Sequence, residues 1–304
     1  MIRRLLFASA FISIALGSSG CGKISGPSLL KSITDPDYNG IKHYFGWGEY
    51  LTGFMGNETK YDVQHTHSLF TSGLGGDYQG RKLTGHEFNQ EDIHREWNTV
   101  RDTFKSDDMY VQYSSGHGSD DGLAVGVSYD EMRDYALSLN ARETVIFTMA
   151  CYSGNLVDSF KAKKNEWENH RAEGRTLFVM ASSESDDTSS TGPGRDPDEP
   201  NGPNGSAGSA FGHALWKALI GYADRKGPGM TGNADGKISL EEIINFTVKK
   251  TQQVGGHTPV HTGSYDPALV IAKVPSPAQL EALLGATDEG RRELAELRAD
   301  GFID

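Results

Sequence analysis

Residues 144–155 read TVIFTMACYSGN, and this stretch decides the fold. An apolar run with β-branched residues leads straight into Cys151, and Tyr, Ser, Gly and Asn follow it. A short continuous apolar run bounded by turn residues is typical of a strand that is buried on both faces of a sheet. The stretch therefore predicts a buried strand at 144–150, with a cysteine at the point where the backbone turns.

Similar runs recur along the chain and alternate with helical patterns. We predict further strands at 41–47, 109–115, 176–181 and 268–274. Helical patterns lie at 58–72, 90–105, 128–139, 155–172, 208–222, 239–253 and 277–299. Nearly continuous apolar strands separated by helices predict an α/β fold with a mostly parallel sheet and helices on both faces. In such folds, ligands bind at the carboxyl ends of the strands.

Three of the predicted helices begin with a capping box, in which Ser is followed three residues later by Glu or Gln. The pairs are Ser128 with Glu131, Ser239 with Glu242, and Ser276 with Gln279. Because each box satisfies two backbone N–H groups that the helix itself cannot pair, these pairs mark where the helices start.

The first 21 residues, MIRRLLFASAFISIALGSSGC, have the form of a bacterial export signal. Two arginines precede an apolar run that is too short to span a bilayer as a mature helix, and small residues follow. The ending at Cys21 resembles the cleavage box of bacterial lipoproteins, so we expect a signal peptide at 1–20, a lipidated Cys21 and a tether at 21–40. Ser18 stands where such boxes usually carry Leu, which leaves a plain secretory cleavage as the alternative. The expected location is the bacterial cell envelope, where the lipid anchor holds the protein on a membrane.

The chain is acidic. Its 304 residues have a formal net charge of −12, which becomes −14 when residues 1–20, with two arginines and no acid, are removed. A surface of this charge repels the phosphates of nucleic acid and of anionic lipids. We therefore expect no nucleic-acid partner.

Cys151 is the only cysteine besides Cys21. If Cys21 is acylated, Cys151 has no disulfide partner and is a free thiol in an oxidising compartment. This favours a nucleophile over a packed core residue or half of a disulfide.

A histidine follows the strand predicted at 109–115. The sequence MYVQYSSGHG ends this strand in small residues and then presents His117, with Gly118 after it. If this strand and the strand at 144–150 are parallel and joined by one crossover helix, His117 and Cys151 emerge at the same edge of the sheet.

These residue types support nucleophilic catalysis. A thiol needs a base or a positive field to become a thiolate at neutral pH, and His117 can be that base and later the acid for a leaving amine. The helix predicted to begin near Asn155 adds the positive end of its dipole beside the sulfur. The backbone N–H groups of Gly118 and Cys151 could form an oxyanion hole.

The order strand, SGHG, helix, strand, ACYSG, followed by ASS after a further strand and by the helix GSAFGHALWKAL, resembles the legumain-like and caspase-like cysteine peptidases of clan CD. The resemblance covers roughly residues 41–274, and its dyad motif matches His117-Gly118 and Ala150-Cys151. It implies a caspase-like three-layer sandwich and a Cys–His dyad that hydrolyses peptide bonds in a peptide or protein substrate through an acyl-enzyme. No cofactor is required for this chemistry.

Two departures from the family pattern indicate a divergent bacterial member. Met149 stands where the caspase signature has Gln, and Tyr152 stands where legumains carry an acidic residue, which puts specificity for Asn in doubt. Two alternatives to hydrolysis stay open: a legumain-like transamidase or ligase, and a catalytically inactive lipoprotein that binds peptides or calcium.

Residues 185–209, SDDTSSTGPGRDPDEPNGPNGSAGS, are rich in Gly, Pro and acids and predict a mobile acidic loop. A lid, a self-cleaved segment and a plain solvated insert are all compatible with this composition. The loop follows Ser182 and Ser183, at a strand end where such peptidases build part of the substrate pocket, so we predict that both serines bind substrate. Residues 275–304 predict a C-terminal helical tail.

The stretch TGNADGKISLEEI, 231–243, predicts a structural calcium site. With Gly236 at the sixth position of a calcium loop, the ligands are Asn233, Asp235, the carbonyl of Lys237 and the carboxylate of Glu242, with Asp224 folding back to supply a further oxygen. The alternative is a turn at Asp235-Gly236 that leads into a helix, with Glu242 serving the capping box of Ser239.

Overall fold

The computed structural model describes residues 40–49, 56–71, 78–85, 88–189, 208–227, 230–285, 288–299 and 301–303. The predicted signal peptide, the lipidated Cys21, nearly all of the tether and residues 190–207 of the acidic loop lie outside the described residues. Within the described ranges, every helix is too short or too polar to cross a membrane.

The centre of the molecule is a six-stranded sheet in the order β2-β1-β3-β4-β5-β7. Its strands are β1 (Lys42–Glu49), β2 (Gln79–Gly85), β3 (Met109–Ser115), β4 (Glu143–Met149), β5 (Thr176–Ala181) and β7 (Val260–Ser264). Neighbouring strands are parallel from β2 to β5, and β7 is antiparallel to β5. The predicted mostly parallel sheet is confirmed.

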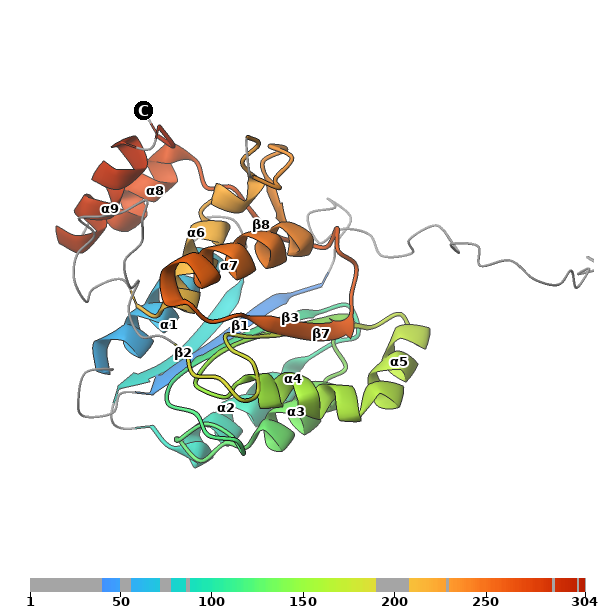
Figure 1. Cartoon of the computed structure of the whole chain (residues 1–304). Helices are drawn as coiled ribbons and strands as arrows, with labels where there is room; N and C mark the ends of the chain where they lie inside the picture. Colours follow the sequence, from blue (N-terminus) through green and yellow to red (C-terminus); the bar gives the residue numbers. More distant parts are fainter. Residues whose placement is uncertain are drawn as a thin grey trace, which may run out of the picture.

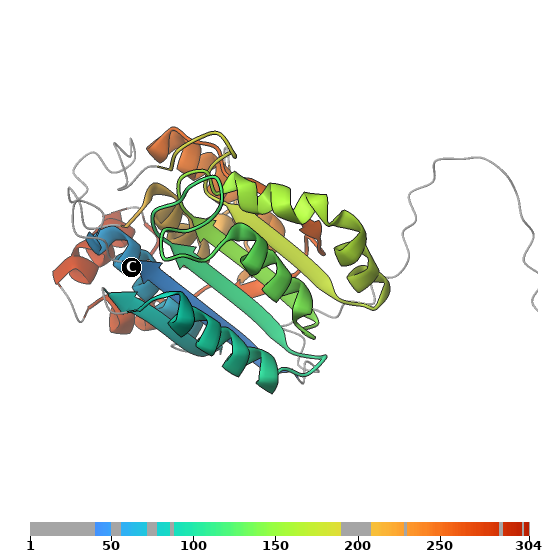
Figure 2. The same ribbon diagram turned by 90° about the horizontal axis from the view of Figure 1, so that it is seen from below.

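Helices cover both faces of this sheet and make a three-layer sandwich (Figures 1 and 2). One face carries α1 (Gly56–Thr71), α6 (Ala210–Leu219) and α7 (Leu240–Gly255). The other carries α2 (Gln90–Thr103), α3 (Tyr129–Ser138), α4 (Gly154–Ala162) and α5 (Lys164–Ala172).

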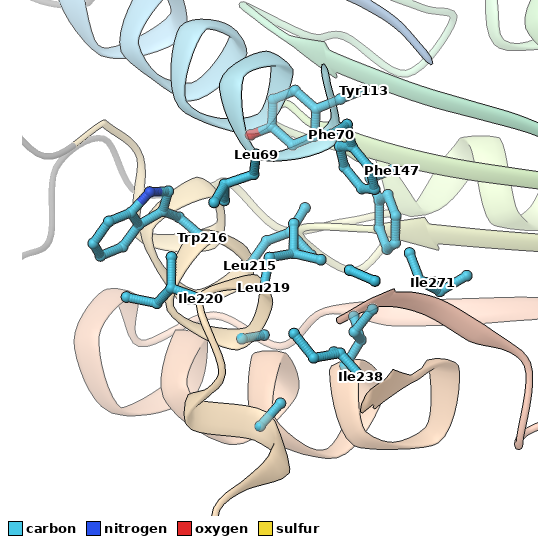
Figure 3. Packing of buried hydrophobic residues seen from close by; sticks show 14 of the residues in the cluster. Leu69, Phe70, Tyr113, Phe147, Leu215, Trp216, Leu219, Ile220, Ile238 and Ile271 are labelled. Atoms are coloured by element: carbon cyan, nitrogen blue, oxygen red, sulfur yellow. The ribbon is translucent and has the colours of Figure 1, made fainter. Parts of the chain in front are cut away.

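Two hydrophobic cores, one on each face, explain the apolar run that ends at Cys151. Side chains along β4 alternate between the faces. Phe147 packs in the core formed with α1 and α6, where Figure 3 shows it near Phe70 and Leu215. Its neighbour Ile146 packs in the opposite core with α2, α3 and α4. Because both faces are covered, every residue of β4 is buried.

Three strands were not predicted, and a fourth pairs outside the main sheet. β2 and β7 lie at the two edges of the sheet and are only partly buried, so they lack the apolar run that marks a central strand. The predicted strand at 268–274 forms as β8 (Val270–Lys273), but it pairs with the short β6 (Lys237–Ser239) in a separate two-stranded sheet.

Two long helical predictions are each divided in the structure. The helix predicted at 155–172 is α4 and α5, which meet at Lys163, where the backbone leaves the helical region. The C-terminal tail forms α8 (Pro277–Leu284) and α9 (Asp288–Ala299), and Leu280 and Leu297 bury into the core on the α6 side. The tail therefore packs on the body of the protein.

Candidate active site

The turns that follow β3 and β4 leave the sheet at the same edge. The two strands are parallel, with Ser115 opposite Met149 at their ends, and the backbone N–H of Gly116 donates to the Met149 carbonyl at 3.0 Å. His117 and Cys151 each lie two residues beyond this last pair. The structure thus brings together the two segments that the sequence singled out.

Gly118 packs directly against the cysteine. A Cβ atom on Gly118 would lie 2.2 Å from the Cys151 carbonyl oxygen and 2.8 Å from the Cβ of Ala150. Both distances are below any normal contact, so only a glycine allows the two turns to approach this closely.

The N–H of Gly118 points out of its own hairpin. The Ala124 N–H donates to the His117 carbonyl at 3.0 Å, and the Ser119 N–H donates to the Gly122 carbonyl at 2.9 Å, so Gly118 occupies a non-hydrogen-bonded position between them. Within the described part of the chain, neither the Gly118 N–H nor the Cys151 N–H donates a hydrogen bond. Two backbone donors are therefore available at the junction of the two turns.

The cysteine sits in a sharp turn between β4 and α4. Tyr152 adopts a φ of +57°, a left-handed conformation that is uncommon for a residue with a side chain. Its N–H donates to the Asp187 carbonyl at 2.8 Å, which helps to hold this conformation. Cys151 is partly exposed and is a free thiol among the described residues. Backbone strain of this kind is concentrated at functional sites.

A cluster of serine hydroxyls lies behind the turn and surrounds the Ala150 carbonyl oxygen. Ser189 Oγ lies 2.8 Å from this oxygen, Ser182 Oγ 3.2 Å and Ser183 Oγ 3.3 Å. Ser182 and Ser183 are fully buried. Their hydroxyls face the cysteine turn and support it, and substrate binding by these two serines stays a prediction.

The first described residues of the acidic loop run along the cysteine turn. The Asn155 amide donates to the Ser185 carbonyl at 2.9 Å, and the Cys151 thiol donates to the Ser189 carbonyl, with 3.9 Å between sulfur and oxygen. The start of the loop is thus in direct contact with the thiol.

Tyr129 connects the two turns from the start of α3. Its hydroxyl donates to the Cys151 carbonyl at 3.4 Å, and a Cβ on Gly118 would lie 3.1 Å from the same hydroxyl. Burial raises the pKa of Tyr129, and a negative charge on Cys151 raises it further. The hydroxyl therefore stays protonated and remains a donor.

A second histidine, which the sequence did not single out, lies behind the serine cluster. His257 is buried, and its Nδ1 lies 2.6 Å from the Ser182 carbonyl oxygen. Because a carbonyl only accepts, Nδ1 carries the proton. Burial lowers the pKa of His257, although the hydrogen bond to Ser182 opposes this, so a neutral ring holds the end of β5 in place.

A buried carboxylate was also missed. Asp62 in α1 accepts hydrogen bonds from the hydroxyls of Tyr113 at 3.0 Å, Ser115 at 2.8 Å and Ser209 at 2.7 Å, and from the Ser209 N–H at 2.9 Å. Burial raises its pKa, while the hydrogen bonds from Ser209, Ser115 and Tyr113 oppose the shift. Asp62 thereby ties α1, the end of β3 and the start of α6 together. The signal in the sequence is an acid on the buried face of a helix, together with Thr66 and Phe70.

Asp224 folds back onto the 231–243 segment as expected. Its carboxylate accepts the N–H groups of Asp235 at 3.0 Å and Gly236 at 2.9 Å, and its carbonyl accepts the N–H of Ala234 at 2.7 Å. These bonds close the turn around Gly236, which has a φ of +78°.

The other predicted calcium ligands are also engaged by backbone donors. Glu242 accepts the N–H of Ser239 at 2.8 Å and the N–H of Asn233 at 3.2 Å, and Asp235 accepts the N–H of Lys237 at 2.9 Å. The described residues contain no group of three or more His, Cys, Asp or Glu side chains that could hold a metal ion. The geometry therefore fits the turn and capping box, and calcium binding stays a prediction.

The arrangement of the sheet and its helices is a caspase-like α/β sandwich. Caspase-1 from Spodoptera frugiperda is similar to this chain with a TM-score of 0.50 and 13% identity, over 78% of this chain and 90% of the caspase. A structural-genomics protein from Geobacter sulfurreducens has a TM-score of 0.49 and 12% identity, over 77% of this chain and 97% of its own. No protein-family model and no curated protein matches the sequence. At these identities the likeness establishes the fold alone.

Proposed function

We propose that this protein is a cysteine endopeptidase that hydrolyses peptide bonds through Cys151 and His117. The observation that carries the proposal is the contact between the Gly118 backbone and the Cys151 carbonyl at the shared edge of β3 and β4. This contact joins a histidine turn, a free thiol and two backbone N–H groups without hydrogen-bond partners in the described part of the chain. The caspase-like fold supports a peptidase as the general class.

The reaction has two halves. His117 takes the thiol proton, and the sulfur of Cys151 attacks the carbonyl carbon of the scissile peptide bond. The negative charge that develops on the carbonyl oxygen is stabilised by the N–H groups of Gly118 and Cys151. The C–N bond then breaks, His117 gives its proton to the leaving amine, and an acyl-enzyme thioester remains.

Water completes the cycle. His117 removes a proton from a water molecule, whose oxygen attacks the thioester carbonyl. The C–S bond breaks, the carboxylic acid leaves, and the sulfur recovers the proton from His117. α4 begins at Gly154, three residues after Cys151, and the positive end of its dipole stabilises negative charge on the sulfur. Protein groups supply every step, so the proposed chemistry uses no cofactor.

The proposal also includes a location. The export signal and the lipoprotein-like cleavage box at Cys21 support an enzyme that is anchored to a membrane of the bacterial cell envelope and acts on peptides or proteins there.

Two assays test the dyad: alkylation of the thiol over a range of pH, and cleavage of a panel of peptides. Iodoacetamide reacts with the thiolate, so Cys151 of the wild type should react at lower pH than the same thiol in His117→Ala. Fluorogenic peptides that vary at P1 should be cleaved by the wild type and by the control His170→Ala, but not by His117→Ala or Cys151→Ala. His170 lies on α5, which leads into the amino end of β5, whereas Cys151 follows the carboxyl end of β4.

Superimposable alkylation curves for the wild type and His117→Ala would show that no base acts on the thiol. Equal peptide cleavage by the wild type and a folded Cys151→Ala would remove the nucleophile from the proposal. Mass spectrometry of the products distinguishes hydrolysis from transfer to an added amine, since only transfer joins the amine to the new carboxyl end.

A further inference from the structure

The peptide group between Ala150 and Cys151 has its carbonyl and its N–H in very different surroundings. The carbonyl oxygen lies among three serine hydroxyls, whereas the Cys151 N–H meets no acceptor in the described part of the chain. A trans peptide group is planar, and its C=O and N–H point in opposite directions. The hydroxyls therefore hold the side of this peptide that faces away from the proposed oxyanion hole.

Ser189 makes the shortest of these contacts. Its Oγ lies 2.8 Å from the Ala150 oxygen, against 3.2 Å for Ser182 and 3.3 Å for Ser183. The Oγ atoms of Ser182 and Ser189 are also hydrogen-bonded to each other. The backbone N–H of Ser153 also donates to this oxygen, at 3.3 Å. A carbonyl oxygen has two lone pairs, so Ser189 and one further donor are enough to satisfy it.

The position of Ser189 is set by the cysteine turn itself. Tyr152 N–H and the Asn155 amide, on the C-terminal side of Cys151, hold the carbonyls of Asp187 and Ser185. These bonds bring the segment back across the turn, so that Ser189 reaches the peptide that precedes Cys151.

We propose that Ser189, backed by Ser182, is a positioning residue for the oxyanion hole. A hydrogen bond to an amide oxygen draws electron density from the nitrogen, and hydrogen bonds in such chains strengthen one another. Donation to Ala150 therefore makes the Cys151 N–H a stronger donor and fixes its direction. The Ser189 hydroxyl bonds to the Ala150 oxygen and to Ser182, and it is the Ser189 backbone carbonyl that accepts from the Cys151 thiol. This inference rests on the proposed peptidase function.

The test compares Ser189→Ala with Ser185→Ala. Ser185 belongs to the same segment, and only its backbone carbonyl enters a described hydrogen bond. For each variant we would measure kcat, KM, the inhibition constant of a peptide aldehyde matched to the best substrate of the panel, and the rate of iodoacetamide alkylation. The aldehyde forms a tetrahedral adduct whose oxygen needs the oxyanion hole, whereas alkylation needs only the thiolate.

Loss of one neutral hydrogen bond should lower kcat and the aldehyde affinity of Ser189→Ala by about two- to tenfold. KM and the alkylation rate should stay at the wild-type values, and Ser185→Ala should match the wild type throughout. Ser189→Thr keeps the hydroxyl and should restore kcat and aldehyde affinity, which also excludes a general folding defect.

Several results would overturn the assignment. Aldehyde affinity equal in Ser189→Ala and Ser185→Ala would show that the hydroxyl does not act on the hole. A parallel fall in alkylation and in kcat would show that it acts through the thiol. If the wild type is active and Ser189→Ala is unchanged, only this inference fails. A wild type that neither cleaves the panel nor binds the aldehydes overturns the proposed function and the inference with it.

Discussion

Replacement of Gly118 by Ala tests the contact on which the proposed active site depends. The new Cβ would lie 2.2 Å from the Cys151 carbonyl oxygen, whereas an ordinary contact needs at least 3.4 Å. The two turns must therefore separate by roughly 1 Å. The backbone conformation of Gly118 is one that alanine can adopt, so the effect comes from space alone.

The expected loss is large for activity and moderate for stability. A displacement of about 1 Å at reacting groups costs on the order of a hundredfold in rate, so kcat/KM should fall by about that factor. Overpacking of a well-packed core typically costs about 1–3 kcal/mol of unfolding free energy, and Gly118 is half-buried, so the lower part of this range is expected. Fluorogenic peptide hydrolysis and thermal unfolding measure the two quantities separately.

A control variant distinguishes a steric clash beside the active site from a steric clash elsewhere in the protein. In Gly290→Ala, the Cβ would lie 2.0 Å from the Leu284 carbonyl oxygen, in the C-terminal tail. This variant should lose stability but keep its kcat/KM at a temperature where it is folded. Wild-type kcat/KM in folded Gly118→Ala would refute the placement of Gly118 against the nucleophile.

Three further predictions concern other parts of the chain. Burial raises the pKa of Glu143 from 4.5 to about 7, with the Arg142 guanidinium opposing the shift, so the folded state binds more protons between these values and stability should fall as pH rises through this window. Glu143→Gln should reduce the difference in unfolding free energy between pH 5 and pH 8 by up to about 3 kcal/mol. An unchanged difference would show that other groups cause the pH dependence. Excess calcium should raise the melting temperature of the wild type but not of Asp235→Ala. Equal melting temperatures with calcium and with a chelator would show that residues 231–243 form only a turn and a helix cap. Labelled palmitate should enter the wild type and not Cys21→Ser, and a wholly soluble, unlabelled wild type would contradict the lipid anchor.

The central strands and the helix starts were predictable because they depend on residues that are close together in the sequence. β3 and β4 are covered by helices on both faces, so every position is buried and apolar residues run together without a polar alternation, which the sequence shows directly. The predicted capping boxes at Ser128, Ser239 and Ser276 are all present, since each needs only residues three positions apart. Because both residues follow the ends of predicted parallel strands, the sequence alone predicted that His117 and Cys151 lie at the same edge of the sheet.

Edge strands and long-range polar contacts were not predictable in the same way. β2 and β7 form because an edge of the sheet is free to pair, and their polar, glycine-containing sequences show no period that marks them. The predicted strand at 268–274 left the main sheet because β6 offered a different partner. Pairing partners are a property of the assembled fold, not of the strand that pairs.

The sequence by itself determined the class of fold and the two turns that hold the proposed dyad. Only the tertiary structure decided what supports them: Asp62 under the end of β3, Tyr129 between the turns, and Ser189 on the Ala150 carbonyl. These contacts join residues 22 to 53 positions apart. A hydrophobic pattern repeats along the chain and can be read locally, whereas a buried hydrogen bond needs one donor and one acceptor at a single point that the packing of several elements creates.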